Sequence, residues 1–172
     1  MTALRDGMIA YLTRPEIHEI VKRLAKEIEI DYARQEIVLV CPLKGSFLFV
    51  ADLMRAMQTP QLVEFVQLSS SGRRGSVRIL KDIECNLENK DVLIVEEIID
   101  AGRTLSFLKQ RLLMANPKSV KICTLLDKPA RRELALKPDY VGVTIDDRYV
   151  VGYGMDSQEV GRNYGDIYYF KQ

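Results

Sequence analysis

Two kinds of apolar spacing alternate along the chain. The segment Thr13-Arg14-Pro15-Glu16 is typical of a capping box at a helix start, and helical apolar spacing follows it. The residues expected to form the buried face of this helix are Ile17, Ile20, Val21, Leu24, Ala25 and Ile28. Helical spacing returns in residues 47–57 and 103–115. The residues expected to face inward in the second of these are Leu105, Leu108, Leu112 and Ala115.

Short continuous apolar runs, partly β-branched, lie between the helical segments and are typical of strands covered on both faces. They span residues 37–43, 62–68, 92–95, 120–126 and 140–145. Residues 77–83 predict a further strand or hairpin arm, and the polar stretch SSSGRRGS (69–76) predicts a mobile loop. Strands that alternate with helices predict parallel βαβ units, and therefore an α/β fold with a mainly parallel central sheet flanked by helices.

Composition narrows the class of protein. A length of 172 residues suits one domain, and 47% hydrophobic with 28% charged residues is ordinary for a globular chain. A net charge of +1 gives no electrostatic case for nucleic acid binding. No apolar run approaches the roughly 18 residues of a membrane span, and the N-terminus does not look like a secretory signal. We therefore expect a cytoplasmic protein with neither nucleic acid nor membrane as a partner.

The cysteines and the single histidine predict no metal site of their own. Cys41, Cys85 and Cys123 are odd in number and widely spaced, which favours free, buried thiols over a disulfide. His18 lies off the apolar face of its helix and has no second histidine with which to share a metal ion, so a surface position is expected.

Polar segments follow three of the predicted strands. In parallel sheets, ligands bind at the carboxyl ends of the strands, so these segments together predict the functional site. They are LKGS (43–46), EEIIDAGRT (96–104) and DKPARR (127–132).

The segment DAGRT (100–104) has the chemistry of a phosphate site. Its glycine permits a tight turn, and the helix that follows offers free N–H groups beside the Thr104 hydroxyl and the Arg103 charge. A plain strand-to-helix turn is the competing explanation. Glu96 and Glu97 suit sugar hydroxyls or a divalent cation next to the phosphate, and a ribose 5-phosphate satisfies both demands. Asp100 would then lie near the anomeric carbon or the attached base.

The stretch VLIVEEIIDAGRTL (92–105) resembles the phosphoribosyl pyrophosphate (PRPP) motif of type I phosphoribosyltransferases. That motif is an apolar strand, two acids, two aliphatic residues and then acid-Thr/Ser-Gly-x-Thr. The segments DKPARR, KPDYVG and DRYVVGYGMD are similar to the 6-oxopurine branch, the hypoxanthine-guanine phosphoribosyltransferases. The resemblance implies the type I phosphoribosyltransferase fold as one domain over 1–172, with a core at about 33–147 and a small hood formed by the N-terminal segment and about 148–172.

The resemblance implies roles at the PRPP end of the site. Glu96 and Glu97 would bind the ribose hydroxyls, in part through Mg²⁺, and Asp100 would be the general acid or base at the purine N7. The 5′-phosphate would bind Ala101, Gly102, Arg103 and Thr104. The pyrophosphate would meet Arg162 and the loop of Leu43, Lys44, Gly45 and Ser46, in which the family has a cis peptide between the first two residues. The lid would begin at Ser70 and Ser71.

At the purine end, the resemblance assigns Lys128 to the 6-oxo group, Tyr149 to stacking on the ring and Val150 to main-chain contacts. Asp156 would lie near the purine 2-position and a second Mg²⁺, which makes Glu96, Glu97 and Asp156 the expected metal ligands. An ammonium has only donors, so Lys128 favours an oxo group over an amine. Taken alone, Lys128 is more typical of a solvated charge, and Tyr149 is more typical of a packing residue.

The implied activity is purine salvage: transfer of the 5-phosphoribosyl group from PRPP to hypoxanthine or guanine, giving IMP or GMP and pyrophosphate. A weakly active or regulatory nucleotide-binding paralogue, and an enzyme for adenine or xanthine, are the alternatives. Lys128 addresses only the 6-oxo group, so the order of hypoxanthine, guanine and xanthine stays open. A homodimer or homotetramer is implied by the resemblance alone.

Three departures from the family pattern predict slower turnover than that of an ordinary member. Glu97 replaces the usual aspartate, and Ala101 replaces a Thr or Ser whose hydrogen bond to a charged group would contribute on the order of 1.5–3 kcal/mol. The lid is shorter and lacks a tyrosine, although Arg73 and Arg74 either meet pyrophosphate or form a solvated basic turn. Steady-state kinetics with PRPP and hypoxanthine measure this, and turnover equal to that of an ordinary member would refute it.

Overall fold

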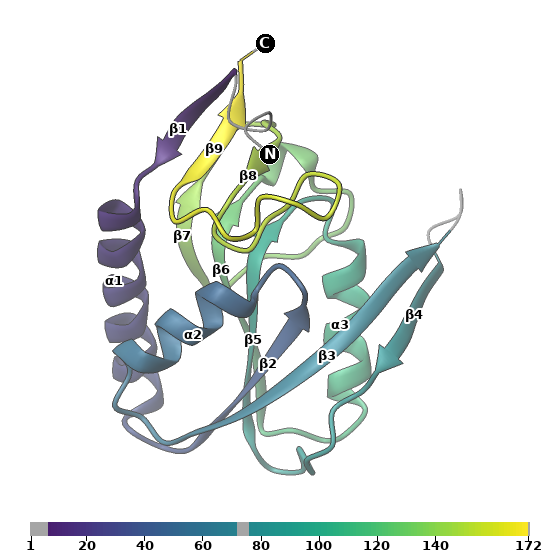
Figure 1. Ribbon diagram of the computed structural model, residues 1–172. Helices are drawn as coiled ribbons and strands as arrows, with labels where there is room; N and C mark the ends of the chain where they lie inside the picture. Colours follow the sequence, from purple (N-terminus) through teal and green to yellow (C-terminus); the bar gives the residue numbers. More distant parts are fainter. Residues whose placement is uncertain (1–6, 72–75, 172) are drawn as a thin grey trace.

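A mainly parallel sheet forms the centre of the molecule (Figure 1). The structure is a computed structural model and describes residues 7–71 and 76–171. The strands of this sheet are β2 (Ile37–Leu43), β3 (Gln61–Ser71), β4 (Ser76–Lys81), β5 (Asp91–Ile99), β6 (Ser119–Asp127) and β7 (Tyr140–Thr144). They lie in the order β4-β3-β2-β5-β6-β7, and only β4 runs antiparallel to its neighbour. The predicted fold class is confirmed.

Helices cover both faces of this sheet. The helices α1 (Arg14–Tyr32) and α2 (Phe47–Ala56) pack on one face, and α3 (Arg103–Leu113) packs on the other. Because side chains alternate along a strand, Leu39 of β2 contributes to the core under α1 and α2, whereas Val38 and Val40 contribute to the core under α3. Both faces of the strands are therefore dry, which explains their continuous apolar runs.

The predicted helix faces are largely confirmed. Glu16 accepts hydrogen bonds from the Thr13 N–H and hydroxyl at 2.7 Å each, as expected for a capping box. The predicted apolar face of α1 is buried apart from a partly exposed Ile20, and His18 is exposed. The helix α3 ends at Leu113, two residues before the prediction, although Ala115 still packs against the same core.

The two ends of the chain meet in a second, smaller sheet. Its strands β1 (Met8–Leu12), β9 (Ile167–Phe170) and β8 (Val150–Val151) pair antiparallel in that order. Figure 1 shows this sheet as a hood at the end of the molecule where the parallel strands finish. The division into a core at 33–147 and a hood from about 148 stays a prediction. No helix among the described residues is long and apolar enough to cross a membrane.

Two predicted boundaries are wrong, because strand pairing extends past the apolar runs. The strand β5 continues from 95 to Ile99, so Glu96 and Glu97 lie within the strand, and Glu96 pairs with Thr124 of β6. The strand β3 continues to Ser71 and pairs with β4 from Ser76, so 69–71 and 76 do not belong to the predicted loop. Residues 72–75, including Arg73 and Arg74, lie outside the described residues, as do the side chains of 70, 71 and 76.

Candidate active site

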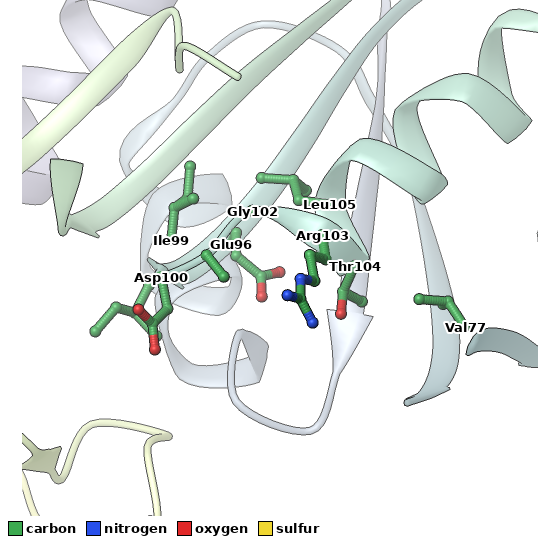
Figure 2. A pocket seen from close by; sticks show the side chains of 10 residues that line it. Val77, Glu96, Ile99, Asp100, Gly102, Arg103, Thr104 and Leu105 are labelled. Atoms are coloured by element: carbon green, nitrogen blue, oxygen red, sulfur yellow. The ribbon is translucent and has the colours of Figure 1, made fainter. Parts of the chain in front are cut away.

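A cavity of about 370 Å³ opens at the carboxyl end of β5, within the size range of small-molecule sites. Figure 2 shows the Glu96, Arg103 and Thr104 side chains close together, with Asp100 at the opposite side from Thr104. The cavity therefore brings together Glu96 and the predicted residues 100–104 of the central motif. Residues that the sequence analysis did not assign also line the cavity, namely Val77, Ile98, Ile99 and Leu105.

The turn between β5 and α3 has the geometry of an anion site. Gly102 has a φ of 81°, a left-handed conformation that glycine adopts without strain, and it forms the N-cap of α3. The Ser106 N–H donates to the Gly102 carbonyl at 2.9 Å, so the N–H groups of the residues between them have no partner within the helix. These groups and the positive end of the helix dipole favour a phosphate at 101–104.

Glu96 and Glu97 carry buried oxygen atoms without partners. The Oε2 atoms of both are buried and accept no hydrogen bond from the described residues. Burial raises the pKa of Glu97 to about 7, and burial together with the nearby Glu97 charge raises the pKa of Glu96 well above its usual range. An unpaired carboxylate is costly to bury. Donors from a ligand, such as sugar hydroxyls, or a hard cation would satisfy both groups.

The two acids turn toward different parts of the site. Glu96 lines the cavity with the phosphate turn, whereas Glu97 lies against the loop of residues 43–46. A Cβ atom on Gly45 would lie 1.8 Å from Glu97 Oε1. The Glu97 carboxylate therefore occupies the space that a side chain at position 45 would need, and glycine leaves that space free.

The three expected metal ligands are not gathered into one site. Across 7–71 and 76–171, no three His, Cys, Asp or Glu side chains could jointly hold an ion. Asp156 instead pairs with Arg162 at 2.7 Å. Magnesium often takes only one or two protein carboxylates and completes its shell with substrate phosphates and water. The unpartnered oxygens of Glu96 and Glu97 fit that role without a third ligand.

The predicted pyrophosphate residues meet at the junction of core and hood. The Leu43–Lys44 peptide is cis, as the family resemblance implied. Lys44 Nζ pairs with Glu159 at 2.7 Å, and Glu159 also lies 3.5 Å from Arg162. Arg162 donates to the Gly154 carbonyl at 2.9 Å, while its buried Nε has no partner among the described residues. The cations of this junction are thus held by local carboxylates.

The structure shows the surroundings of the two side chains that are expected at the purine end, Lys128 and Tyr149. Lys128 is only 6% exposed and lies 3.8 Å from Asp147, so a solvated charge is excluded. Tyr149 is 58% exposed, and its hydroxyl donates to the Asp156 carbonyl at 3.0 Å. Its ring touches Phe170 at a centroid distance of 6.0 Å but is not enclosed, which suits a stacking platform. Val150 is buried beside it.

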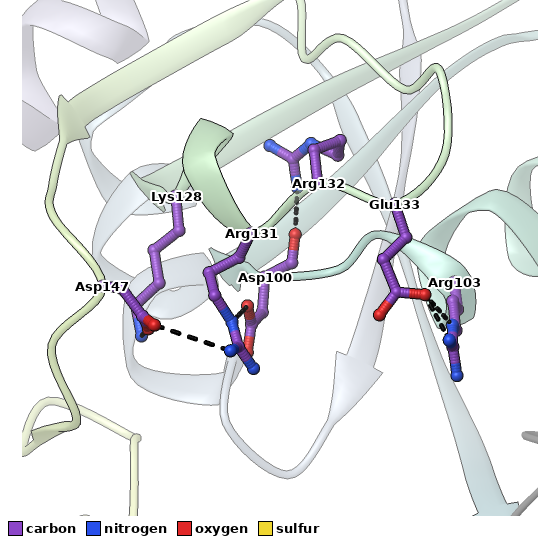
Figure 3. A network of polar contacts seen from close by, with 7 residues as sticks. All are labelled: Asp100, Arg103, Lys128, Arg131, Arg132, Glu133 and Asp147. Atoms are coloured by element: carbon purple, nitrogen blue, oxygen red, sulfur yellow. Dashed lines mark hydrogen bonds and ion pairs between the residues drawn. The ribbon is translucent and has the colours of Figure 1, made fainter.

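A polar network surrounds the turn at Asp100 (Figure 3). Arg131 Nε donates to Asp100 Oδ1 at 3.0 Å, and Arg132 donates to the Asp100 carbonyl at 2.5 Å. Arg103, expected at the phosphate, donates to Glu133 at 2.6 Å instead, so a carboxylate already balances its charge. The sequence analysis assigned no role to residues 131–133, although the motif DKPARR contains two of them. Nothing in that motif indicates which acid each arginine meets.

The central sheet is mainly parallel, and two partly buried acids and an anion-binding turn lie at the end of its strand β5. This combination is typical of the phosphoribosyltransferase class. The model of the phosphoribosyl transferase domain family matches residues 9–158, and the chain belongs to this family.

The relatives of the chain lie in the branch that the sequence motifs indicated. It is 44% identical to the hypoxanthine-guanine phosphoribosyltransferase of Aquifex aeolicus over 98% of each chain. A crystal structure of a hypoxanthine-guanine phosphoribosyltransferase from Bacillus anthracis superposes with a TM-score of 0.93 at 44% identity, covering 95% of this chain and 98% of that one. The hypoxanthine phosphoribosyltransferase of Trypanosoma cruzi, solved with the product IMP, gives 0.90 at 37% identity over 94% and 93%. The resemblance to the 6-oxopurine branch is confirmed.

Burial of Glu97 predicts that its replacement by glutamine stabilises the free protein. Its folded-state pKa is raised to about 7 from 4.5, so the unfolded chain releases this proton first and stability falls as pH rises between those values. Glu97→Gln removes that loss, worth on the order of 1–2 kcal/mol. The Tm of the variant should exceed that of wild type near pH 8, and the gap should narrow near pH 5.

The measurement is thermal unfolding without ligand. The exposed Glu88→Gln serves as the matched control, because it changes the same charge on the surface. A variant whose Tm falls below wild type at both pH values would contradict the assignment of Glu97 as a group destabilised by burial.

Proposed function

We propose that this protein is a purine-salvage enzyme that transfers the 5-phosphoribosyl group of PRPP to N9 of hypoxanthine or guanine. The products are IMP or GMP and pyrophosphate. The observation that carries the proposal is the pair of buried, unpartnered Oε2 atoms on two consecutive acids, of which Glu96 lines the cavity with the turn at 101–104 and Glu97 lies against the loop of residues 43–46. A phosphorylated pentose supplies both the hydroxyl donors and the anion that this arrangement lacks. The relatives, one of them in complex with IMP, support the same substrates.

Different residues of the chain would bind the purine, transfer its proton and bind the pyrophosphate. Asp100, next to the phosphate turn, is placed to manage the proton at the purine N7. The buried ammonium of Lys128 would donate to the 6-oxo group, and Tyr149 would stack on the ring. Arg162 and the loop of 43–46 would bind the departing pyrophosphate, for which the planar guanidinium is well suited.

Magnesium has a place in this proposal that the chain's own residues support. Glu96 and Glu97 would hold it together with the substrate, since their free oxygens are hard donors. Bound there, the ion would supply neutralisation of the pyrophosphate charge. Asp156 could join only by leaving its ion pair with Arg162.

The same proposal implies the partners, the cellular location and the oligomeric state of the protein. Its partners would be small molecules, PRPP and a 6-oxopurine base, and we place it in the cytoplasm as a homodimer or homotetramer. The relatives give no support to a regulatory or weakly active paralogue.

Selection for the 6-oxo group is the test of this function. Lys128 presents donors and no acceptor, so adenine should be used with a kcat/KM at least about 100-fold below that of hypoxanthine. The assay follows nucleotide formation from PRPP with hypoxanthine, guanine, xanthine and adenine, each with Mg²⁺ and with chelator. Comparable use of adenine, or no IMP in any condition, would refute the proposal, and Lys128→Met should reduce the preference for the oxo group.

A further inference from the structure

Four charges of alternating sign connect the two ends of the proposed site. Asp100 Oδ1 accepts from Arg131 Nε at 3.0 Å, and Arg131 reaches Asp147 Oδ2 at 3.5 Å. The other oxygen of Asp147 lies 3.8 Å from Lys128 Nζ. Figure 3 shows Arg131 joined to both Asp100 and Asp147, with the Lys128 side chain beside Asp147. The outer two residues of this series are Asp100, the proposed general acid or base, and Lys128, the proposed donor to the 6-oxo group. The proposed function assigns no role to the inner two residues, Arg131 and Asp147.

Backbone hydrogen bonds fix the segments that carry these charges. Asp100 follows β5, Arg131 closes the short helix η1 (Pro129–Arg131), and Asp147 precedes β8. The Lys128 N–H donates to the Ile99 carbonyl at 3.0 Å, and the Ile145 N–H donates to the Asp127 carbonyl at 2.8 Å. The three segments are thereby tied to one another next to the site, so the order of charges follows from the fold.

The inner pair, Arg131 and Asp147, restricts the side-chain conformations of the outer residues, Asp100 and Lys128. The Asp100 side chain is 48% exposed, so packing alone does not select its rotamer, and the Arg131 hydrogen bond does. Lys128 is nearly buried, and a buried ammonium requires a counter-charge. Asp147 is the carboxylate within 4.0 Å of its Nζ among the described residues, and the same carboxylate anchors Arg131.

The neighbouring charges cannot take over these roles. Arg132 is already engaged by the Asp127 side chain and the Asp100 carbonyl. Glu133 is paired with Arg103 across the phosphate turn. A half-exposed ion pair often contributes little by itself. Arg131 and Asp147 differ from these neighbours because they contact each other, and each also contacts a residue with a proposed role in the reaction. Arg131 contacts Asp100, and Asp147 contacts Lys128.

We propose that Arg131 and Asp147 are positioning residues that set the directions of Asp100 and Lys128 together, so that the purine meets its proton-transfer group and its 6-oxo donor in one arrangement. The inference rests on the proposed function. Because one carboxylate serves both cations, Asp147 acts on purine binding and on turnover, whereas Arg131 acts mainly on turnover.

The test is a double-mutant cycle in steady-state kinetics with PRPP and hypoxanthine. Arg131→Met should lower kcat about tenfold and leave KM for hypoxanthine within about twofold. Asp147→Asn should lower kcat and raise that KM about fivefold, because Lys128 loses its counter-charge. Since the residues act as one unit, the double variant should lose less kcat than the product of the single losses. Arg131→Lys should recover part of the turnover.

Asp146→Asn is the matched control, because the neighbouring aspartate is 85% exposed and its only ion pair among the described residues is with Arg148, at 3.6 Å. It should stay within about twofold of wild type. IMP binding by calorimetry and thermal unfolding show that each variant is folded. Wild-type kcat in Arg131→Met, or losses that multiply in the double variant, would overturn the inference. Failure of the proposed function looks different, because wild type itself would then form no IMP.

Discussion

The structure depends on holding two partly buried carboxylates, each with one buried and unpartnered oxygen, at the carboxyl end of a central strand. The strand β5 lies between β2 and β6, and its ladder with β6 continues to the pair Ile99–Asp127. Extended pairing holds the backbone of Glu96 and Glu97 in place although the Oε2 atom of each has no partner among the described residues. The protein therefore keeps a local electrostatic cost at this position, which a ligand with hydroxyl groups or a cation relieves. Binding energy and site geometry come from the same interaction.

The charged side chains around Glu96 and Glu97 are paired with opposite charges. Nearly every other charge at the site has a partner of opposite sign within the chain: Lys44 with Glu159, Arg103 with Glu133, Arg162 with Asp156. A substrate as highly charged as PRPP must therefore exchange partners with these pairs rather than meet bare cations. This explains how a site for a pyrophosphorylated sugar exists in a chain of net charge +1.

The sequence predicted the fold and the central motif well because both depend on local patterns. Continuous apolar runs report strands buried on both faces, and DAGRT reports a strand-to-helix turn. The predictions failed where long-range pairing decides. The ladder with β6 places Glu96 and Glu97 inside β5, and the antiparallel pairing with β4 continues β3 to Ser71. The contacts that residues 131–133 make with Asp100 and Arg103 were equally hidden, since these partners lie about thirty residues away in the chain.

The exchange of aspartate for Glu97 illustrates why a motif cannot be judged residue by residue. From the motif alone, one added methylene looks like a defect, because it moves the carboxylate away from its expected position. In the structure the extra length is taken up against the backbone of Gly45, in a loop that comes from another strand. The carboxylate consequently lies against the loop of residues 43–46, with Arg162 close enough to lower its pKa against the larger effect of burial. The room available to the side chain at position 97 therefore depends on residue 45 of another segment, which the motif by itself does not reveal.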